Sequence, residues 1–288
     1  MSMRSTSVGE IASWLKGLER LRAAGSVRSP TFIKPYHLVT LAMALRENPR
    51  GMAELPDEVS RYATRMHLWD AAGLEPPDYV REHPTEDRFQ PTAPLRTEED
   101  VATCSRNLTA IVQRHGKVDE ETLSSIDIAI AELANNCFNH AGLGAGEVGL
   151  VCAQAWEGGN RAQIAFADPG MGIRESLSRN PGLRAHLSEA NACKLASEYG
   201  VTGNPGGHTG YGLCLARDLM RNNGGVFVVF SGREAFWQGG SRRESRHFDP
   251  LWPGTMVVIE WRTNYPLSAS DVYANWPLPP GMDHDDFF

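Results

Sequence analysis

The chain has 288 residues, which is enough for one large domain or two smaller ones with a hydrophobic core. Its 41% hydrophobic and 22% charged residues are typical of globular proteins, and its net charge of −7 argues against a chain built around a nucleic-acid backbone. No apolar run approaches the roughly 18 residues of a membrane span, and the opening MSMRSTSVGE lacks the apolar core of a signal peptide.

The first predicted unit spans residues 1–78 and combines helices with a short strand. The spacing of apolar residues predicts an opening helix between a Ser7 cap and a Gly25 stop. The segment TFIKP predicts a strand, and YHLVTLAMALRE and EVSRYATRMHLWDAAGL predict two further helices. We expect these elements to form a small α/β domain.

A change in composition separates this unit from the rest of the chain. The stretch EPPDYVREHPTEDRFQPTAP carries five prolines in twenty residues, which predicts a linker over residues 79–96. A second unit is predicted over residues 97–264, with helices in its first part and strands after them. The predicted strands are EVGLVCAQAW, RAQIAFAD, GVFVVFSG and GTMVVIEW. We expect GREAFWQGGSRRESRHF to form a loop between the last two strands, and residues 265–288 to form a proline-rich, acidic tail.

One of the predicted helices, which continues to Ala141, carries the polar segment AELANNCFNHAG. Asparagine is a poor helix residue because its amide competes for nearby backbone groups. At about 100° per residue, Glu132, Asn136 and His140 share one face of the helix, and Asn139 falls between them. This face is either a functional site or a solvated surface, and the pattern alone leaves both open.

Two glycine-containing segments follow this helix. DPGMGI places Asp168 at the end of a buried strand, before Gly170 and Gly172, although DPG is also a common turn. GGHTGYGL opens a helix, an arrangement in which backbone N–H groups hold phosphate. No Lys-Ser or Lys-Thr follows these glycines, which excludes a Walker A loop, and the acidic residue of a nicotinamide-binding unit is missing.

In their order along the chain, these three segments resemble the motifs of the histidine kinase-like ATPases, the GHKL superfamily. The N box would be ELANNCFNH, the first glycine box DPGMGI and the second GGHTGYGL, with NNGG and a final GT further on. The resemblance covers about residues 88–264. It implies an α/β fold of the Bergerat ATP-binding type: a two-layer α/β sandwich whose mixed, mostly antiparallel sheet is covered by helices on one face, here preceded by the small α/β domain.

The resemblance also implies roles for individual residues. Asn136 would supply a neutral amide oxygen to Mg²⁺ beside the triphosphate of ATP, and Glu132 would act as the general base. Asp168 would accept a hydrogen bond from the 6-amino group of adenine. The full set of residues implied to contact ATP is Asn136, Asn139, His140, Asp168, Gly170, Gly172, Gly207, His208, Thr209, Gly210, Tyr211, Gly212, Leu213 and Thr255.

Residues 173–206 would form a lid over the nucleotide. Its cations are either counter-charges for phosphate or ordinary surface groups, and they are Arg174, Arg179, Arg184 and Lys194. Asn135 points to one side of the polar helix face, which favours a structural role for it.

Three functions fit such a chain. We favour an ATP·Mg-dependent regulatory protein, similar to the anti-sigma-factor serine kinases, that hydrolyses ATP or transfers its γ-phosphate to a protein. The N-terminal unit adds a slight likeness to STAS domains, the fold of anti-sigma antagonists, in TFIKPYHLVTLA and YATRMHLWDAAGL. The alternative is a non-catalytic, nucleotide-gated interaction or clamp module. A sensor histidine kinase is less favoured, because its only tempting phosphoacceptor, His37, lacks the usual acidic neighbour.

We expect a protein partner or substrate, and the sequence leaves a homodimer open. Nucleic acid and membranes are not expected as partners. Five scattered cysteines without a CxxC pair favour reduced thiols and therefore a cytoplasmic location.

Overall fold

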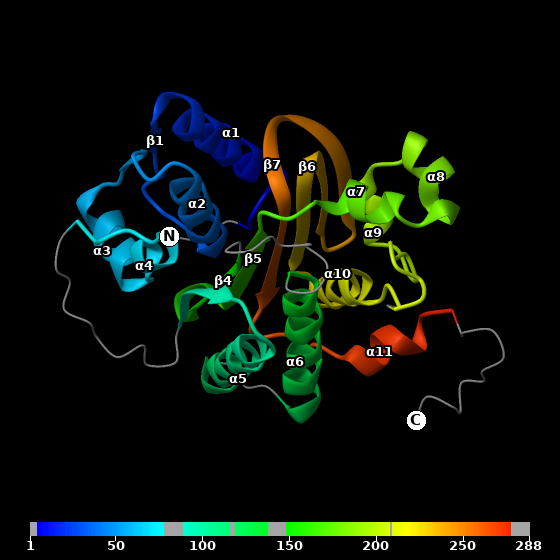
Figure 1. Ribbon diagram of the computed structural model, residues 1–288. Coiled ribbons are helices and arrows are strands. Elements are labelled where there is room, and N and C mark those ends of the chain that lie inside the picture. Colours follow the sequence, from blue (N-terminus) through cyan, green and yellow to red (C-terminus); the bar gives the residue numbers. More distant parts are fainter. Residues whose placement is uncertain (1–4, 78–88, 116–118, 138–147, 208, 278–288) are drawn as a thin grey trace.

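The computed structural model describes residues 5–77, 89–115, 119–137, 148–207 and 209–277 (Figure 1). A central sheet runs through the molecule, with helices packed against it from both sides. In these ranges, each helix falls short of the length and apolarity that crossing a bilayer requires.

The N-terminal part is a small α/β unit. It contains α1 (Val8–Ala24), β1 (Ser26–Arg28), α2 (Pro35–Glu47), β2 (Met52–Glu54), α3 (Asp57–Arg65) and α4 (Leu68–Ala72), and β1 pairs with β2 in parallel. Ser7 caps α1 in a reciprocal capping box with Glu10, and Gly25 ends the helix with a left-handed φ of 84°. The predicted opening helix is therefore confirmed.

The strand predicted at TFIKP is wrong. Residues 31–34 lie outside any strand, and Pro35 is the first residue of α2. A proline suits that position because its fixed φ is helical and its missing N–H would have no partner within the helix. The Lys34 N–H instead donates to His37 Nδ1 (2.9 Å), which stabilises the first turn.

A five-stranded antiparallel sheet forms the centre of the molecule, in the order β3-β4-β5-β7-β6. Its strands are β3 (Phe89–Leu95), β4 (Gly149–Trp156), β5 (Arg161–Asp168), β6 (Val226–Gly239) and β7 (Arg242–Arg262). The four predicted strands are confirmed, whereas β3 lies within the segment predicted as a linker. The sequence does not predict β3 because Pro91 and Pro94 are atypical of a strand. An edge strand tolerates these prolines because one of its sides makes no ladder hydrogen bonds.

The hairpin of β6 and β7 is longer than the sequence predicts. Register shifts around Gly232 bend it, and Gly240 N at its tip donates to Gly225 O at the start of β6 (3.1 Å). The segment predicted as a loop is strand, with Phe236 paired to Ser245. Its alternation is hard to recognise because residues 242–249 of β7 are mostly exposed on both faces.

Helices cover both faces of the sheet, and alternate strand residues face the two layers. The helices α5 (Glu98–His115), α6 (Glu120–Asn135) and α10 (Gly212–Asn223) pack on one face, where Val151 and Phe166 belong to the core. On the other face, α1 and α2 pack over residues such as Leu150 and Ala165. The predicted mixed α/β fold with an antiparallel sheet is confirmed, and the N-terminal unit adds a second helical layer.

A buried polar network joins the N-terminal segment to the sheet. Glu260 of β7 is fully buried, and its Oε2 accepts hydrogen bonds from Thr6 Oγ1 (2.8 Å) and Gln163 Nε2 (3.1 Å). Arg161 Nη1 donates to its other oxygen (2.8 Å). Lys34 Nζ donates to Thr6 Oγ1 (2.9 Å) and lies 3.9 Å from Glu260 Oε2. The N-terminal unit and the sheet therefore share both a core and an ion-pair network.

Short helices complete the described chain. Residues 173–206, the segment predicted as a lid and called the lid below, contain α7 (Ile173–Ser178), α8 (Arg184–Glu189) and α9 (Ala192–Ala196), with a 3₁₀ turn, η3 (Pro181–Leu183), among them. A second 3₁₀ turn, η2 (Glu157–Gly159), joins β4 to β5. After β7, α11 (Ala269–Ala274) packs against α6 and α10, and Leu267 and Val272 are buried in the core. Part of the segment predicted as a tail is thus a packed helix. Residues 278–288 lie outside the described ranges.

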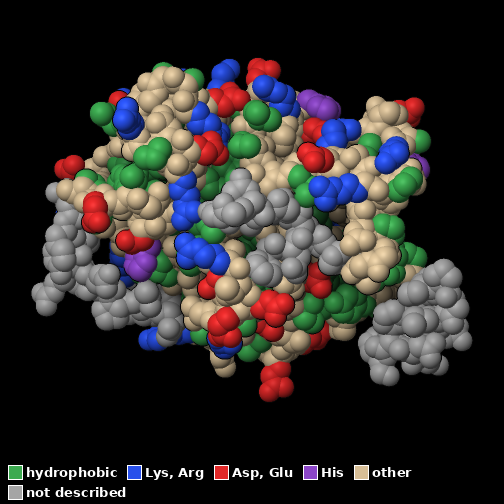
Figure 2. All heavy atoms as spheres, viewed as in Figure 1, with side chains coloured by type: hydrophobic (Ala, Val, Ile, Leu, Met, Phe, Trp, Pro, Cys, Tyr) green, Lys and Arg blue, Asp and Glu red, His purple; other side chains and the backbone are tan. Residues whose placement is uncertain are grey.

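The surface over α6 is acidic. Figure 2 shows Asp and Glu side chains gathered there, and Glu120 and Glu121 occupy its first turn after the Asp119 cap. Carboxylates at this end stabilise the helix because they complement the positive end of its dipole.

Candidate functional site

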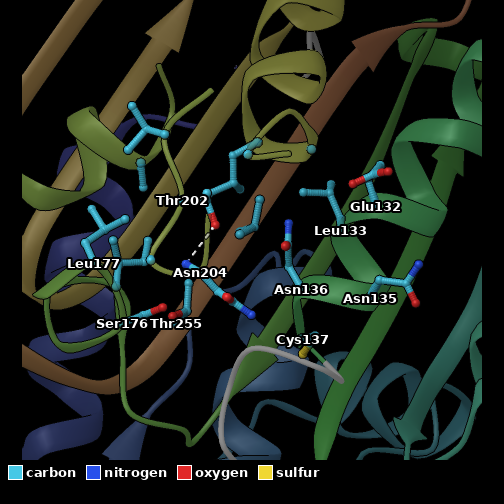
Figure 3. Close-up of a pocket in the computed structure, with 18 of the residues that line it drawn as sticks. Glu132, Leu133, Asn135, Asn136, Cys137, Ser176, Leu177, Thr202, Asn204 and Thr255 are labelled. Atoms are coloured by element: carbon cyan, nitrogen blue, oxygen red, sulfur yellow. Dashed lines mark hydrogen bonds between the residues drawn. The ribbon is translucent and has the colours of Figure 1, made fainter. Parts of the chain in front are cut away.

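A cavity of about 550 Å³ lies where the end of α6, the sheet, the lid and the start of α10 meet (Figure 3). Phe166 of β5 and Val257 of β7 give it an apolar floor, and Glu132 and Thr255 lie on opposite sides of it in the figure. Its volume falls within the roughly 300–1,000 Å³ of small-molecule sites. All three sequence motifs contribute to its lining.

The polar face of α6 borders the cavity at the end of the helix. Glu132, Asn135 and Asn136 all line it. In Figure 3, the Asn136 side chain points upward between Asn204 and Leu133, whereas Asn135 extends to the right, away from Asn204. The helix was predicted to continue to Ala141. The α-helical part of α6 ends at Asn135 and residues 136–137 continue it as a π-helical turn, whereas residues 138–147 lie outside the described ranges, so the predicted end of the helix stays a prediction.

Gly212, the first residue of α10, lies directly against these side chains. A Cβ at this position would stand 2.6 Å from Glu132 Oε2 and 3.2 Å from Asn136 Nδ2, so a side chain here would force these two groups to move. The first N–H groups of a helix have no partner within it and attract anions. The start of α10 is therefore suited to hold an anionic group, such as a phosphate, next to Glu132.

The rest of the second glycine box borders the same cavity. The lining residues are Gly207, Thr209, Gly210, Tyr211 and Leu213. Gly210 has a φ of 73°, and a Cβ there would meet Val201 O at 2.6 Å, so both its backbone and its surroundings exclude a side chain. Three predicted site residues, Asn139, His140 and His208, lie outside the described ranges.

Asp168 ends β5 at the cavity and is 5% exposed. Its Oδ1 accepts a hydrogen bond from Gly170 N (2.8 Å). Thr255 of β7 pairs with it and also lines the cavity. Gly254 packs on its backbone, since a Cβ there would stand 2.0 Å from Asp168 O. This places a well-fixed acceptor beside an apolar floor, where it would select a ligand that offers a donor.

The first glycine box shapes this corner. Gly172 lines the cavity with a φ of 77°, and a Cβ there would stand 2.9 Å from Ser231 Oγ. Ser231 Oγ accepts from Ile173 N (2.8 Å) and donates to the β7 backbone (2.7 Å). Gly170 does not border the cavity, and its contribution is the hydrogen bond to Asp168.

The four lid cations occupy different surroundings. Two hydrogen bonds of 2.7 Å join Arg174 to Glu234, and these bonds raise the pKa of the Arg174 guanidinium. Arg174 also donates to two lid carbonyls, so it serves the lid itself. Arg184 donates to another lid carbonyl (3.1 Å), and Lys194 does not border the cavity. Among the described residues that line the cavity, Arg179 alone is a Lys or Arg.

The polar lid residues that line the cavity were not predicted from the sequence. Ser176, Thr202 and Asn204 line the cavity, and Asn204 N donates to Thr202 Oγ1 (3.1 Å, dashed in Figure 3). Gly203 fits against the lid backbone, where a Cβ would stand 2.2 Å from Ser176 O. Serine, threonine and asparagine are ordinary loop residues, so no local pattern marks these positions.

Asn136 offers the donor type that a magnesium ion accepts, a neutral hard oxygen. In the described part of the chain, no three His, Cys, Asp or Glu side chains converge on a cation site. Magnesium would therefore be bound largely by oxygens that a ligand brings. Phosphate oxygens at the start of α10 would lie beside Asn136 and would fit this requirement.

Comparison with known proteins identifies a family for this part of the chain. The family model described as the histidine kinase-like ATPase domain matches residues 94–223. The match begins in β3 and ends with α10, so it includes Glu132, the turn after Asp168 and the second glycine box. No curated protein matches the chain.

Proposed function

Because residues 94–223 form a histidine kinase-like ATPase domain, we propose that this protein is an ATP·Mg-dependent regulatory switch that hydrolyses ATP or transfers its γ-phosphate to a protein. One observation carries the proposal: Gly212 packs against Glu132 and Asn136. This contact brings a carboxylate, the Asn136 amide and a helix N-terminus to one corner of the cavity. A terminal phosphate would be bound and attacked there.

Asp168 would select adenine on the other side of the cavity. The base would lie over the apolar floor of Phe166 and Val257, with its 6-amino group donating to the Asp168 carboxylate. Guanine presents an oxygen at that position and would be repelled by the carboxylate. Thr255 pairs with Asp168 and would add a hydrogen bond near the base.

The phosphates would lie along the second glycine box. Donors available to them are the first N–H groups of α10, the hydroxyl of Thr209 and the guanidinium of Arg179. Asn136 would share the magnesium ion with the phosphate oxygens. Contacts from Asn139, His140 and His208 remain part of the proposal, although these residues lie outside the described ranges.

Glu132 would be the general base. It lines the cavity beside the start of α10, within reach of a nucleophile that approaches the terminal phosphate. With water as the nucleophile the result is hydrolysis, and with a serine or threonine hydroxyl of a protein it is phosphorylation. The same carboxylate therefore serves both forms of the switch.

The surroundings of His37 argue against a sensor histidine kinase. Its ring is 6% exposed, accepts from Lys34 N and stacks on Tyr36 with centroids 3.9 Å apart. Burial lowers its pKa to about 3. It belongs to α2, which packs on the face of the sheet opposite α6, so transfer to it would require α2 to leave the core.

The test measures ATP binding and γ-phosphate release with magnesium for the wild type, Glu132→Ala and Glu120→Ala. Glu120 is an exposed glutamate in the first turn of the same helix and serves as the matched control. We expect Glu132→Ala to bind ATP and to lose about 10²–10⁴-fold in turnover, the usual contribution of a general base. Glu120→Ala should behave as the wild type.

Other outcomes are equally informative. Tight binding without release by the wild type would indicate a kinase that awaits its protein substrate, or a nucleotide-gated interaction module. Absence of ATP binding would contradict the proposal.

A further inference from the structure

Four aromatic side chains from separate parts of the chain meet beside the cavity, and we call them the aromatic cluster. Tyr199 follows α9, Tyr211 precedes α10, and Tyr273 and Trp276 belong to the segment around α11. The rings of Tyr199 and Tyr211 stack with centroids 4.7 Å apart, and their hydroxyls are 3.1 Å apart. Trp276 packs against both, at 5.0 and 5.4 Å, and Tyr273 lies 5.2 Å from Trp276.

Trp276 is anchored at its polar edge. Its Nε1 donates to Asp218 Oδ2 (3.1 Å), and Arg217 Nη2 donates to the same oxygen (2.8 Å). Asp218 is 3% exposed on α10, so this anchor is buried. The preceding helix is fixed to α6, because Ala269 N donates to Ser125 Oγ (2.7 Å). Hydrophobic side chains gather where α11 lies beside α6 (Figure 2). The C-terminal segment thus joins the two helices that border the cavity.

The aromatic cluster reaches the site through Tyr211. This residue lines the cavity and directly precedes Gly212, which packs on Glu132. A movement of Tyr211 would therefore displace the start of α10 from Glu132. Tyr199 lies near the end of the lid, so its stacking on Tyr211 holds that end in place. Tyr273 approaches the same carboxylate: burial and then the charge of Glu132 raise the pKa of Tyr273.

We propose that Trp276 is a positioning residue that packs Tyr199 and Tyr211 together and thereby holds the end of the lid and the second glycine box over the cavity. The proposal rests on the proposed function and deepens it, because it names the element that controls retention of the nucleotide. The family match ends at Asn223, so the segment that supplies Trp276 lies outside it. Release of α11 from α6 and α10 would loosen the site, which makes this segment a point of regulation.

Two measurements on the whole 288-residue chain test this proposal. Hydrogen exchange of the nucleotide-free protein monitors residues 192–214 without any need for ATP. Stopped-flow dissociation of a fluorescent ATP analogue monitors retention of the nucleotide. Trp276→Ala removes the ring contacts and the hydrogen bond to Asp218, and Trp276→Phe keeps a ring but not the N–H. Tyr265→Ala is the control, because Tyr265 is a 45% exposed aromatic of the same segment outside the cluster.

We expect Trp276→Ala to raise exchange in residues 192–214 and the dissociation rate by about tenfold each, the size expected from the loss of two aromatic contacts. Exchange in β5 should stay at the wild-type rate. In Trp276→Phe, exchange and dissociation should be faster than in the wild type and slower than in Trp276→Ala. In Tyr265→Ala, both rates should match those of the wild type.

Unchanged exchange in residues 192–214 of Trp276→Ala would overturn the proposal. An equal rise in β5 and β7 would also overturn it, because a purely structural residue behaves in that way. A local rise in exchange in a protein that binds no ATP would support the role of Trp276 and contradict the proposed function instead.

Discussion

Gly212 and Glu132 are in direct contact, and the missing side chain of the glycine makes the contact fit. Any Cβ at residue 212 would stand 2.6 Å from Glu132 Oε2. The end of α6 and the start of α10 therefore meet at a point where a side chain at residue 212 would displace Glu132. A general base acts only within hydrogen-bond reach of its proton, so this contact would fix the geometry of the chemistry proposed for Glu132.

Gly212→Ala should lower turnover by about 10²-fold, because Glu132 or the start of α10 must move. The stability of α10 should not decrease, since alanine is more favourable than glycine in a helix by about 1 kcal/mol. Steady-state kinetics and thermal denaturation together separate these effects. Gly206→Ala is the control, because the nearest atom to its Cβ, Asn204 Oδ1, is 4.0 Å away. An equal loss of turnover in both variants would show that the contact is not the cause.

Gly254→Ala should lower both stability and ATP affinity. Gly254 has a φ of 97°, and its Cβ would stand 2.0 Å from Asp168 O. Backbone strain of this kind costs about 1–3 kcal/mol, and relief of the clash would shift Asp168. Urea denaturation and ATP titration measure the two effects. Gly9→Ala in α1, where a Cβ meets no atom within 4 Å, should preserve both. Wild-type affinity in a destabilised Gly254→Ala would mean that the position of Asp168 does not control binding.

Removal of residues 1–88 should prevent the rest of the chain from folding. The sheet face with Leu150, Ala165 and Phe230 would lose its cover, and Glu260 would lose its hydrogen bond from Thr6. Full burial of a large apolar side chain contributes about 1.5–3 kcal/mol, so several such losses would exceed a typical stability of about 5–15 kcal/mol. Circular dichroism and size-exclusion chromatography of residues 89–288 provide the measurement.

A monomeric fragment with cooperative unfolding would contradict this expectation. It would support the division predicted from the sequence, in which residues 1–78 form a separate small domain. Until that experiment, those domain boundaries stay a prediction.

His37 should make stability depend on pH below its ordinary pKa. Burial lowers that pKa from 6.5 to about 3, so the native ring stays neutral where the unfolded ring binds a proton. The contribution of His37 is therefore complete above pH 6.5 and falls as the pH decreases toward 3. Between pH 7.5 and 5.5 the loss amounts to about 1.4 kcal/mol.

His37→Asn keeps an acceptor for Lys34 N and should remove this part of the pH dependence. Urea denaturation of the wild type and the variant at pH 7.5 and 5.5 measures the difference. Equal pH dependence in both proteins would contradict the assignment of a neutral, buried His37.

Local patterns were enough to predict most of the sheet and the motifs of the site. The alternation in β5 and β7 and the order of the glycine boxes are properties of short segments. Among the described residues implied to contact ATP, only Gly170 does not border the cavity. The sequence did not predict three elements whose composition is atypical of their structure. These are β3 with its prolines, the exposed half of the β6–β7 hairpin and α11.

Contacts between distant segments could not be predicted from such patterns. The fit of Gly212 on Glu132 depends on where α10 begins relative to α6, and the position of Trp276 depends on the path of the chain after β7. The cover that α1 and α2 provide for the sheet follows from tertiary packing, because their apolar faces alone do not specify a partner.

Recognition of adenine by Asp168 tests the central claim most directly. Isothermal titration calorimetry with magnesium would compare ATP with purine riboside triphosphate, which lacks the 6-amino group, for the wild type, Asp168→Ala and the exposed control Asp249→Ala. We predict that the wild type and the control prefer ATP by about 10–100-fold, and that Asp168→Ala binds both nucleotides with similar, weaker affinity. Equal affinities in the wild type, or a preference that survives in Asp168→Ala, would contradict the account.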